Sequence, residues 1–551
     1  MSVFHNSRRV FLLLQPKILP HHHHNHHHCH VNRVQKKLSV FEKLFFRASS
    51  SSSTEGSGGS GVNVKKKKRK EEDKTPDIQK LTEEVEKWSK DWRKPPPIAP
   101  PSTYTFRSHT CGQLTKEDVG ESVKLCGWLT FKRLNGTFMV LRDLYGVTQI
   151  YVPKELENTA KIAFEAPLES VLLIEGKVSL RPDHQRRSDQ ISGEIEVIAN
   201  SITLLNTPKE LRLAYNDLDK VDEELAIQYR HLYIRNPRSQ SVFRKRALFL
   251  GNVRRFMDSN HFIEVETPTL VRRTPGGARE FPVVTKVKDA YYALAQSPQI
   301  LKQLLMCGGM DKYYQIARCY RDEGGKPDRQ PEFTQLDIEM SFTTREDVMR
   351  LVEDLLKYSL PEELLPSPLG APFPVMSYAE CMSKYNSDKP DTGGFLWVVD
   401  FPLFIRGEES NQLEAAHHPF TMPKDVEELY KAKNDSDFEK LEGLSYDLVY
   451  CGAEVGGGSV RIHDVDLQKH VFGKVLGLNL EEIDYLLEGL ESGAPPHGGF
   501  ALGVDRFLAK VMGTRSIRDV IAFPKTSQGK DALSGAPTGL DPEAKKYYGI
   551  K

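Results

Sequence analysis

The sequence has no long apolar run, because no stretch approaches the ~18 consecutive apolar residues that a transmembrane helix needs. Its seven cysteines are scattered and odd in number, and no two of them stand in CxxC spacing. That excludes a disulfide framework and a cysteine zinc site, and it suits a reducing compartment. A P-loop is also absent, because the glycine run at 456–458 is not followed by Lys-Ser or Lys-Thr.

What is present indicates a globular protein of several domains. Hydrophobic residues make up 39% of the chain and charged residues 27%, with a net charge of +1, which are ordinary values for such proteins. At 551 residues the chain is too long for one hydrophobic core. Length therefore predicts about three or four domains.

Acidic residues are missing before Glu42, whereas basic and hydroxylated residues occur throughout that stretch. This composition predicts that residues 1–60 are a mitochondrial targeting segment followed by a low-complexity linker. The tract HHHHNHHHCH at 21–30 has metal-binding chemistry, but low complexity inside a removable leader favours no functional site there.

Residues 61–104 are predicted to form a basic arm, a short helix and a proline-rich spacer. The run KKKKRKEEDK at 65–74 is either a weak contact to nucleic-acid phosphates or a solvated charge run, and both interpretations stay open. The segment DIQKLTEEVEKWSKDWRK predicts the helix, and PPPIAPPS at 95–102 predicts a stiff spacer.

Residues 105–205 show the pattern of a small β-barrel. Five short strands of alternating apolar and polar residues surround one helical stretch, ELENTAKIAFEA: SVKLCGWL, TFMVLRD, VTQIYV, SVLLIEGKV and EIEVIANSITLL. This order is typical of an OB-fold, which binds single-stranded nucleic acid on one face.

The most informative stretch is 314–342, YQIARCYRDEGGKPDRQPEFTQLDIEMSF. Its alternating apolar residues predict two antiparallel strands, with GGKPDRQPE as the connecting loop: Tyr314, Ile316, Leu336, Ile338 and Met340. Such a hairpin would present arginine forks and carboxylates on one face, where a polyphosphate and its metal could lie. The alternative is a charged, solvated hairpin.

The sequence RDE…DRQPEFTQLDIE resembles motif 2 of the class II aminoacyl-tRNA synthetases, as that motif occurs in the aspartyl enzymes. IEVETPTL at 263–270 resembles motif 1, and GGFALGVDR at 498–506 resembles motif 3. Further segments resemble sequences of the aspartyl enzymes: QSPQILKQLLM at 296–306, HHPFT at 417–421, GAEVGGGSVRIH at 452–463 and RDVIAFPKT at 518–526. The resemblance covers about 109–551. It implies an α+β fold in which an N-terminal OB-fold barrel precedes a hinge at 206–240 and an antiparallel catalytic sheet at 241–551.

The resemblance implies a two-step reaction in which ATP and L-aspartate give aspartyl-adenylate, and the aspartyl group then passes to the 3′ end of tRNA(Asp). Arg321 and Arg506 would be catalytic, holding the α- and γ-phosphates; a buried Arg506 would need such an anion partner. The expected ATP-binding residues are Arg321, Asp322, Glu323, Gln330, Phe333, Glu454, Gly503, Val504, Asp505 and Arg506. Mg²⁺ is expected on Asp447 and Glu454, since carboxylate oxygens suit that ion.

Substrate choice, by the same resemblance, depends on positive charge. Arg461 would bind the aspartate side-chain carboxylate with its bidentate fork, and Lys302 would add a second positive charge. Asp337 would hold the ammonium group. The full expected aspartate-binding set is Gln299, Lys302, Asp337, His417, His418 and Arg461.

Four barrel residues would read the anticodon by resemblance: Arg133, Phe138, Gln149 and Glu196. For Phe138 the alternative is an ordinary core aromatic. In the hinge, QYRHLYIRNP departs from the family by Tyr233, which stands where an aspartate is usual. Pro268, at the end of a motif 1 strand, would lie at a homodimer interface.

The inserted domain that bacterial-type relatives carry is missing, because SDKPD at 387–391 is followed directly by TGG and FLWVVDFP. A spliced or incomplete gene product is the other explanation. The resemblance predicts an enzyme of the mitochondrial matrix, with a cytoplasmic pool left open. Three rival functions remain: an enzyme that also charges tRNA(Asn), an aspartate–ammonia ligase, and a regulatory paralogue with a dead site.

Overall fold

The computed structural model describes residues 100–550, apart from 189, 214, 275–276, 324–327, 362–363, 365–368, 371 and 408–410. The targeting segment, the histidine tract, the basic arm, its helix and most of the proline-rich spacer lie outside the described residues. Within the described ranges, no helix combines the length and the apolar character needed to cross a bilayer.

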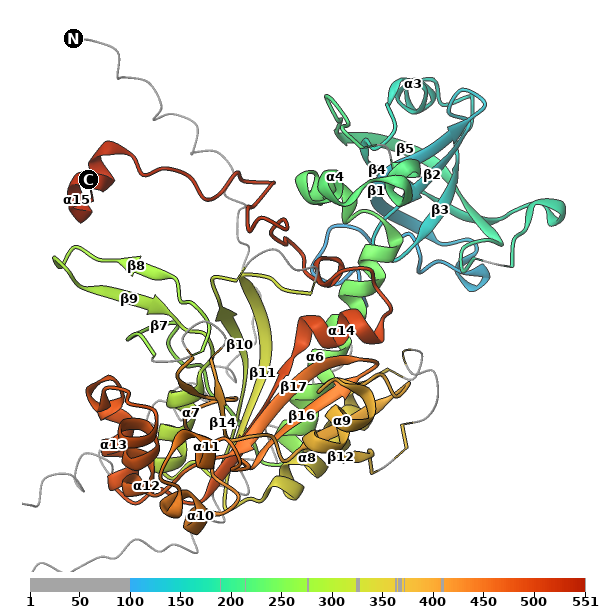
Figure 1. The fold of residues 1–551 in the computed structure, drawn as a ribbon. Coiled ribbons are helices and arrows are strands. Elements are labelled where there is room, and N and C mark those ends of the chain that lie inside the picture. The colour runs from blue at the N-terminus through green and yellow to red at the C-terminus, as the bar shows by residue number, and fades with distance from the viewer. Residues whose placement is uncertain are drawn as a thin grey trace, which may run out of the picture. The chain divides into compact units, whose positions relative to one another are not determined.

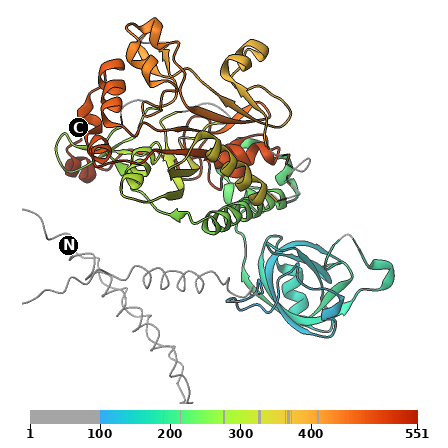
Figure 2. The same ribbon diagram turned by 90° about the horizontal axis from the view of Figure 1, so that it is seen from below.

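The N-terminal part is a closed barrel of five strands in the order β1-β2-β3-β5-β4. Its elements, which match the predicted strands and helix, are β1 (Ser122–Arg133), β2 (Phe138–Arg142), β3 (Val147–Tyr151), α3 (Glu157–Glu165), β4 (Val171–Leu180) and β5 (Ile195–Asn206). Alternate residues such as Leu125, Leu141 and Ile174 point inward and are fully buried. Figure 2 shows the blue and teal strands curving round to close this barrel.

Two short helices, α4 (Glu223–Gln228) and α5 (Arg230–Tyr233), follow the barrel in the chain. The long helix α6 (Pro237–Ser259) comes next. The start of α6 is fixed by its sequence, since the Asn236 side chain accepts a hydrogen bond from the Arg238 backbone N–H and Pro237 occupies the first turn.

The C-terminal part is built on an eight-stranded sheet in the order β12-β13-β16-β17-β18-β11-β10-β6 (Figure 1). These strands are β6 (Ile263–Glu264), β10 (Lys312–Tyr320), β11 (Glu332–Ser341), β12 (Val375–Ser377), β13 (Phe395–Val399), β16 (Ser445–Tyr450), β17 (Ala453–Val460) and β18 (His497–Gly503). The six inner strands pair antiparallel, while β6 and β12 pair parallel at the two edges. The expected antiparallel catalytic sheet is therefore confirmed, with parallel strands added at its margins.

Three helices cover one face of this sheet and enclose the main hydrophobic core: α6, α8 (Arg345–Ser359) and α14 (Val504–Val511). Trp397 and Phe500 lie at its centre, fully buried and edge to face. The Trp397 indole N–H donates to Glu353 Oε1 at 3.1 Å, so the ring has its polar partner inside the core. On the opposite face, Asp337 of β11 is polar, whereas Leu396, Val398 and Val449 belong to a smaller apolar cluster.

Smaller elements complete the part of the chain that the structure describes. The strands are β7 (Leu270–Val271), β8 (Pro282–Val284) and β9 (Tyr291–Leu294) in one sheet, and β14 (Phe404–Arg406) with β15 (Leu413–Ala415) in another. The helices are α7 (Gln299–Cys307), α9 (Tyr378–Tyr385), α10 (Val426–Lys431), α11 (Asp435–Phe438), α12 (Val465–Lys469), α13 (Asp484–Glu491) and α15 (Pro542–Tyr548). Short 3-10 or π turns are η1 (Lys116–Asp118), η2 (Asp183–Gln185), η3 (Tyr215–Lys220), η5 (His470–Val475), η6 (Leu480–Ile483) and η7 (Ile517–Val520).

The motif 1 prediction needs a correction. The strand expected to run to Pro268 ends at Glu264, because β6 pairs with β10 over two residues only. Pro268 lies in the irregular segment between β6 and β7. A proline has no N–H to donate to a ladder, which is consistent with the strand having ended before it.

Candidate functional site

A cavity of about 380 Å³ opens on the polar face of the large sheet. Most of the predicted site residues line it: Gln299, Arg321, Glu323, Gln330, Phe333, Asp337, His417, His418, Asp447, Glu454, Gly503, Asp505 and Arg506. Four others do not. Lys302 and Arg461 are buried, Val504 belongs to the hydrophobic core, and Asp322 is absent from the cavity wall.

The β10–β11 pairing accounts for the polar wall. Tyr314 lies opposite Ile338, and Ile316 opposite Leu336, so the predicted apolar residues share the core face. The alternate residues therefore face the other side, where Asp337 lies opposite Gln315. The apolar pattern of this hairpin is confirmed.

A buried group of four charges lies at one end of this wall. Lys302 Nζ is 3.1 Å from Asp337 Oδ1 and 3.3 Å from Glu339 Oε2. Arg461 donates from Nε and Nη2 to the two oxygens of Glu339 at 3.0 and 3.3 Å. Burial alone would raise the pKa of Glu339, but Arg461 and Lys302 hold it below its ordinary value. Glu339 therefore stays ionised and fixes both cations.

Two hydrogen-bonding positions in this group have no protein partner. Asp337 Oδ2 is buried without a hydrogen-bond partner, and burial raises the pKa of this carboxyl despite the neighbouring Lys302. A cation at Oδ2 would offset that cost. On Arg461, Glu339 takes the Nε–Nη2 edge and Ser459 Oγ accepts from Nη1 at 2.6 Å. The Nη1–Nη2 edge is left for a second carboxylate.

Asp447 and Glu454 come together on a tight hairpin. Strands β16 and β17 are joined by Cys451 and Gly452, both with positive φ, as a two-residue turn requires. The seven-residue spacing thus places the two carboxylates on adjacent strands. Gly457 lies opposite Asp447, and a Cβ there would come within 2.4 Å of Asp447 Oδ1, so glycine leaves room for the carboxylate.

The electrostatics of this hairpin suit a cation. The nearby Asp447 carboxylate, together with burial, raises the pKa of Glu454. Asp447 Oδ1 is buried and has no partner, while its Oδ2 is 3.3 Å from His417 Nε2. Burial would lower the pKa of His417, but Asp447 raises it above its ordinary value. Two crowded carboxylates with a free oxygen form a donor set that fits a hard divalent cation.

Arg321 and Arg506 both line the cavity. Each has a buried Nε without a partner. Arg321 lies over the Phe333 ring at 5.1 Å, and Arg506 donates to the Glu454 carbonyl oxygen at 3.1 Å. The expectation that Arg506 is buried is wrong: its side chain is 29% exposed, because the guanidinium projects from the start of α14 towards Asp328 in the loop before β11.

Other predicted residues already have protein partners. Gln330 forms two hydrogen bonds with the Lys525 backbone, at 2.8 and 3.1 Å. Asp505 accepts from Arg246 and, at 2.7 Å, from the Thr334 N–H. Glu323 pairs with Arg329. These contacts fix the side chains of Gln330, Asp505 and Glu323 at the cavity wall.

His418 differs from its neighbour His417. Burial, followed by Arg461, Lys302 and Arg321, lowers the pKa of His418 to about 3. Its ring is therefore neutral near pH 7, and its buried Nδ1 has no partner.

On the barrel, the four predicted nucleic-acid residues form two pairs. The Arg133 guanidinium lies 4.9 Å from the centre of the Phe138 ring, and Gln149 Nε2 donates to Glu196 Oε2 at 2.7 Å. Phe138 is partly exposed, faces Tyr151 at 5.4 Å and lies outside the barrel core. The core-aromatic alternative is therefore disfavoured.

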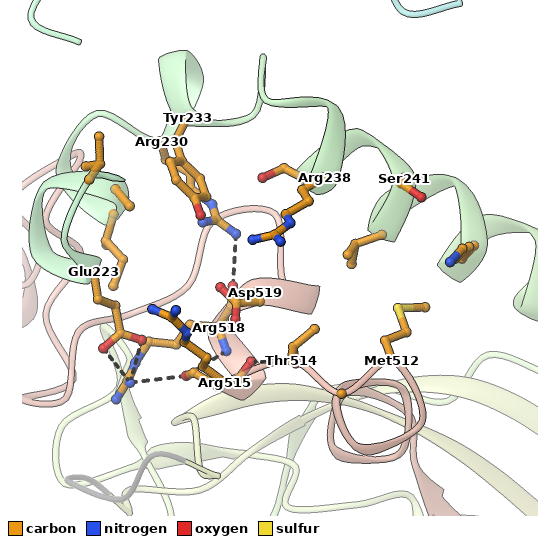
Figure 3. A pocket seen from close by; sticks show the side chains of 18 residues that line it. Glu223, Arg230, Tyr233, Arg238, Ser241, Met512, Thr514, Arg515, Arg518 and Asp519 are labelled. Carbon is orange, nitrogen blue, oxygen red and sulfur yellow. Dashed lines mark hydrogen bonds and ion pairs between the residues drawn. The ribbon is translucent and has the colours of Figure 1, made fainter. Parts of the chain in front are cut away.

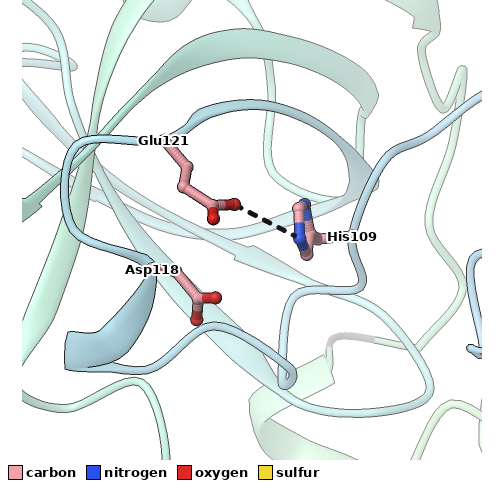
Figure 4. Close-up of side chains that lie close together, drawn as sticks. All are labelled: His109, Asp118 and Glu121. Atoms are coloured by element: carbon pink, nitrogen blue, oxygen red, sulfur yellow. Dashed lines mark ion pairs between the residues drawn. The ribbon is translucent and has the colours of Figure 1, made fainter.

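His109, Asp118 and Glu121 lie close together near the start of β1 (Figure 4). His109 Nε2 is 3.9 Å from Glu121 Oε2. Asp118 is part of a capping box, since its Oδ2 accepts from the Thr115 backbone N–H at 2.7 Å. Local structure thus explains the position of Asp118, and we assign no metal to this cluster.

Two family models match the chain. Residues 222–527 match tRNA synthetases class II (D, K and N), and residues 123–205 match the OB-fold nucleic acid binding domain. The first match spans more than half of the chain and contains the whole cavity described above. The chain belongs to the class II tRNA synthetases of the D, K and N group.

Within that group, relatives at 34–37% identity are named as ligases for aspartate. The mitochondrial aspartate–tRNA ligase of Mus musculus is 37% identical, over 82% of this chain and 90% of its own. The aspartate–tRNA(Asp/Asn) ligase of Dictyoglomus turgidum is 34% identical, over 81% and 98%. Asparaginyl-tRNA synthetase from Pyrococcus horikoshii has a similar fold, with a TM-score of 0.63, 23% identity, and coverage of 76% and 98%.

The mouse alignment runs over 595 positions, more than the 551 residues of this chain, so that enzyme carries segments without a counterpart here. In the structure, residues 386–394 alone connect α9 to β13.

The structure adds two residues that sequence reasoning missed. Glu339 is the anion that fixes Arg461 and Lys302, and Arg246 holds Asp505. Glu339 stands two residues after Asp337 on one strand, so the period-two rule placed it on the same face. Arg246 gave no such signal, because it lies on α6, distant in sequence.

Proposed function

We propose that this chain is an aspartate–tRNA ligase that supplies mitochondrial translation. It activates L-aspartate with ATP and transfers the aspartyl group to tRNA(Asp). The observation that carries the proposal is the buried group that adjoins the cavity through Asp337, in which Asp337 Oδ2 and the Nη1–Nη2 edge of Arg461 are left open. An ammonium group and a side-chain carboxylate are the complements of these two positions.

The chemistry follows from charge placement. The aspartate α-carboxylate attacks the α-phosphorus of ATP, the bond to the bridging oxygen breaks and pyrophosphate leaves, and negative charge spreads over the phosphoryl oxygens in the transition state. Arg321 and Arg506, each with an unpartnered Nε, are placed to neutralise that charge. Neither step needs a dedicated base, so positioning and electrostatic stabilisation supply most of the rate.

Asp447 and Glu454 would hold Mg²⁺, which supplies charge neutralisation between the phosphates. Their fit rests on the unpartnered Asp447 Oδ1 and the raised pKa of Glu454. Glu454 is also 3.5 Å from Lys389 Nζ, which holds this carboxylate from the side.

Asp447→Asn is expected to weaken Mg²⁺ activation, because an amide replaces the charged oxygen at the unpartnered position. The apparent Mg²⁺ constant for ATP–pyrophosphate exchange should rise by about tenfold or more, the range seen when a metal site loses one of its supports. Asp435→Asn, on exposed α11, is the matched control. An unchanged Mg²⁺ constant in the Asp447 variant would remove this residue from the metal site.

Phe138→Ala is expected to raise KM for tRNA about 5- to 150-fold, since one base–aromatic stack is worth ~1–3 kcal/mol. Exchange without tRNA should stay at the wild-type rate. Phe164→Ala, which removes an exposed aromatic side chain on α3, is the control. Aminoacylation titrated with tRNA decides: equal KM values in both variants contradict an anticodon role for Phe138.

A second candidate is an enzyme that charges both tRNA(Asp) and tRNA(Asn). Relatives such as the Dictyoglomus turgidum ligase carry that dual name. Charging assays with the two tRNAs separate the candidates. Comparable kcat/KM values favour the dual enzyme, whereas a preference for tRNA(Asp) favours the single one.

Pro268 is proposed to adjoin a second subunit. It lines a cavity of about 490 Å³ together with Arg272, Tyr485 and His417, which links it to the site through the histidine segment. Exposed apolar side chains on the same lobe, namely Leu270, Val284, Tyr291 and Tyr292, supply surface for a homodimer. Sedimentation at graded concentrations tests this.

A further inference from the structure

A second cavity, of about 750 Å³, lies between residues 221–245 and residues 512–519. Figure 3 shows side chains from helices α4, α5 and α6 facing those of the segment after α14. It shares no residue with the 380 Å³ cavity. The short turn η7 separates them, since Ile517 lines the first cavity while Ser516 and Arg518 line the second.

Positively charged side chains outnumber negatively charged ones in the lining of this second cavity. Five cationic and two acidic side chains line the cavity: Arg230, Arg238, Lys245, Arg515 and Arg518, with Glu223 and Asp519. Glu223 pairs with Arg518 at 3.0 Å, and Asp519 acts electrostatically on Arg230. Arg230 also donates to the carbonyl oxygens of Ala522, Arg518 and Ile521. Both acids are therefore matched by these two arginines.

The other three cations have no partner among the described residues. Arg238, Lys245 and Arg515 make no side-chain hydrogen bond or ion pair within the described chain. They come from two segments, distant in sequence, that both line this cavity. Three unmatched positive charges around one hollow favour an anion there.

Ser239 adds an independent observation. It lines the cavity and is only 7% exposed, yet its hydroxyl has no hydrogen-bond partner among the described residues. Its hydroxyl is therefore available to donate to a ligand in the cavity. Ser239 also stands in the first turn of the 23-residue helix α6, whose amide end attracts negative charge.

We propose that this cavity is a phosphate-binding site, separate from the catalytic cavity. A phosphate group would accept a hydrogen bond from Ser239 Oγ and neutralise Arg238, Lys245 and Arg515. Its oxygens offer enough acceptors for all four donors. The group comes either from free inorganic phosphate or from a phosphodiester of bound RNA, and two experiments distinguish these sources.

The first experiment measures the rise in Tm that inorganic phosphate produces in the full chain. Phosphate bound in the catalytic cavity contributes equally to every variant, so the difference reports this site. Ser239→Ala should leave Tm unchanged or higher without phosphate, because its hydroxyl makes no bond, and should reduce the phosphate-induced rise. Arg238→Gln/Lys245→Gln/Arg515→Gln should reduce it further.

Arg244→Gln is the matched control, since Arg244 is exposed, lies next to Lys245 on α6 and does not line the cavity. It should keep the full phosphate-induced rise. ATP–pyrophosphate exchange should be at the wild-type rate in all these variants, which separates a failure of this site from a failure of the proposed function.

The second experiment measures tRNA affinity at graded salt. If the phosphate belongs to RNA, the triple variant should bind more weakly, and its salt slope should fall by about one for each phosphate that the variant no longer neutralises. If the triple variant changes the phosphate-induced rise in Tm but not the salt slope of tRNA binding, the site exists and its ligand is free phosphate. If the salt slope also changes, the ligand is a phosphodiester of RNA. Equal Tm responses and equal slopes in the triple variant and the control overturn the proposal.

Discussion

Replacing Arg461 with leucine is expected to lower kcat/KM for aspartate by about 10³-fold. The substitution removes a buried guanidinium whose Nη1–Nη2 edge is not taken up by Glu339 and Ser459. Losing one partner of a buried, hydrogen-bonded charge pair costs ~4 kcal/mol, which corresponds to that factor. KM for ATP should change little, because Arg461 does not line the cavity wall that carries Arg321 and Arg506.

The same substitution should destabilise the fold, because it leaves the fully buried Glu339 with Lys302 as its remaining cation. Breaking a buried pair in this way costs ~3–5 kcal/mol. The double variant Arg461→Leu/Glu339→Leu should recover much of that stability without recovering activity. Recovery of aspartate activation in the double variant would contradict the assignment of Arg461 as the aspartate residue.

The stability of this group should also depend on pH. Arg461 and Lys302 hold the pKa of Glu339 below its ordinary value of ~4.3. A lowered pKa in the folded state stabilises the protein above the unfolded pKa, and that contribution is lost as pH falls through the folded value. In Arg461→Leu the loss should begin at higher pH. Denaturant midpoints measured across acidic pH test this, and parallel curves for the two proteins would contradict it.

Replacing Arg321 with methionine is expected to slow pyrophosphate exchange by about 10³- to 10⁵-fold, the range of a single arginine acting on a phosphoryl transition state. The structure places its Nε in the cavity wall without a protein partner, so a phosphate would be its first strong acceptor. The loss should fall mainly on kcat, since the charge develops in the transition state.

Arg318→Met is the matched control for Arg321, because Arg318 lies on β10, shortly before Arg321 in the chain, and does not line the cavity. It pairs with Glu332 at the surface, and such a pair is worth ~0–1 kcal/mol. Equal loss of exchange in both variants would indicate a general effect of the hairpin rather than phosphate binding by Arg321.

Local patterns were sufficient where the chemistry is local. The strands of the barrel and the β10–β11 hairpin follow from alternation, and Tyr314, Leu336 and Ile338 are buried as that alternation predicts. The hairpin that carries Asp447 and Glu454 could not be predicted from alternation alone. Its two-residue turn depends on positive φ at Cys451 as well as at Gly452, and cysteine gives no such signal.

Long-range partners could not be found in this way. Arg246 and Asp505 are far apart in sequence, and their contact exists only because α6 packs beside α14 in the core. The short strand before Pro268 is another case, because β6 ends after two paired residues although its partner β10 continues to Tyr320. The unmatched cations of the second cavity likewise come from segments that are distant in sequence.

The most direct measurement is aspartate-dependent ATP–pyrophosphate exchange by the purified full-length chain. The arrangement of Asp337, Lys302, Glu339 and Arg461 predicts exchange with L-aspartate and little or none with asparagine or lysine, because only aspartate brings a second carboxylate to Arg461. Folded protein that shows no exchange, or that exchanges equally well with asparagine, would contradict the account.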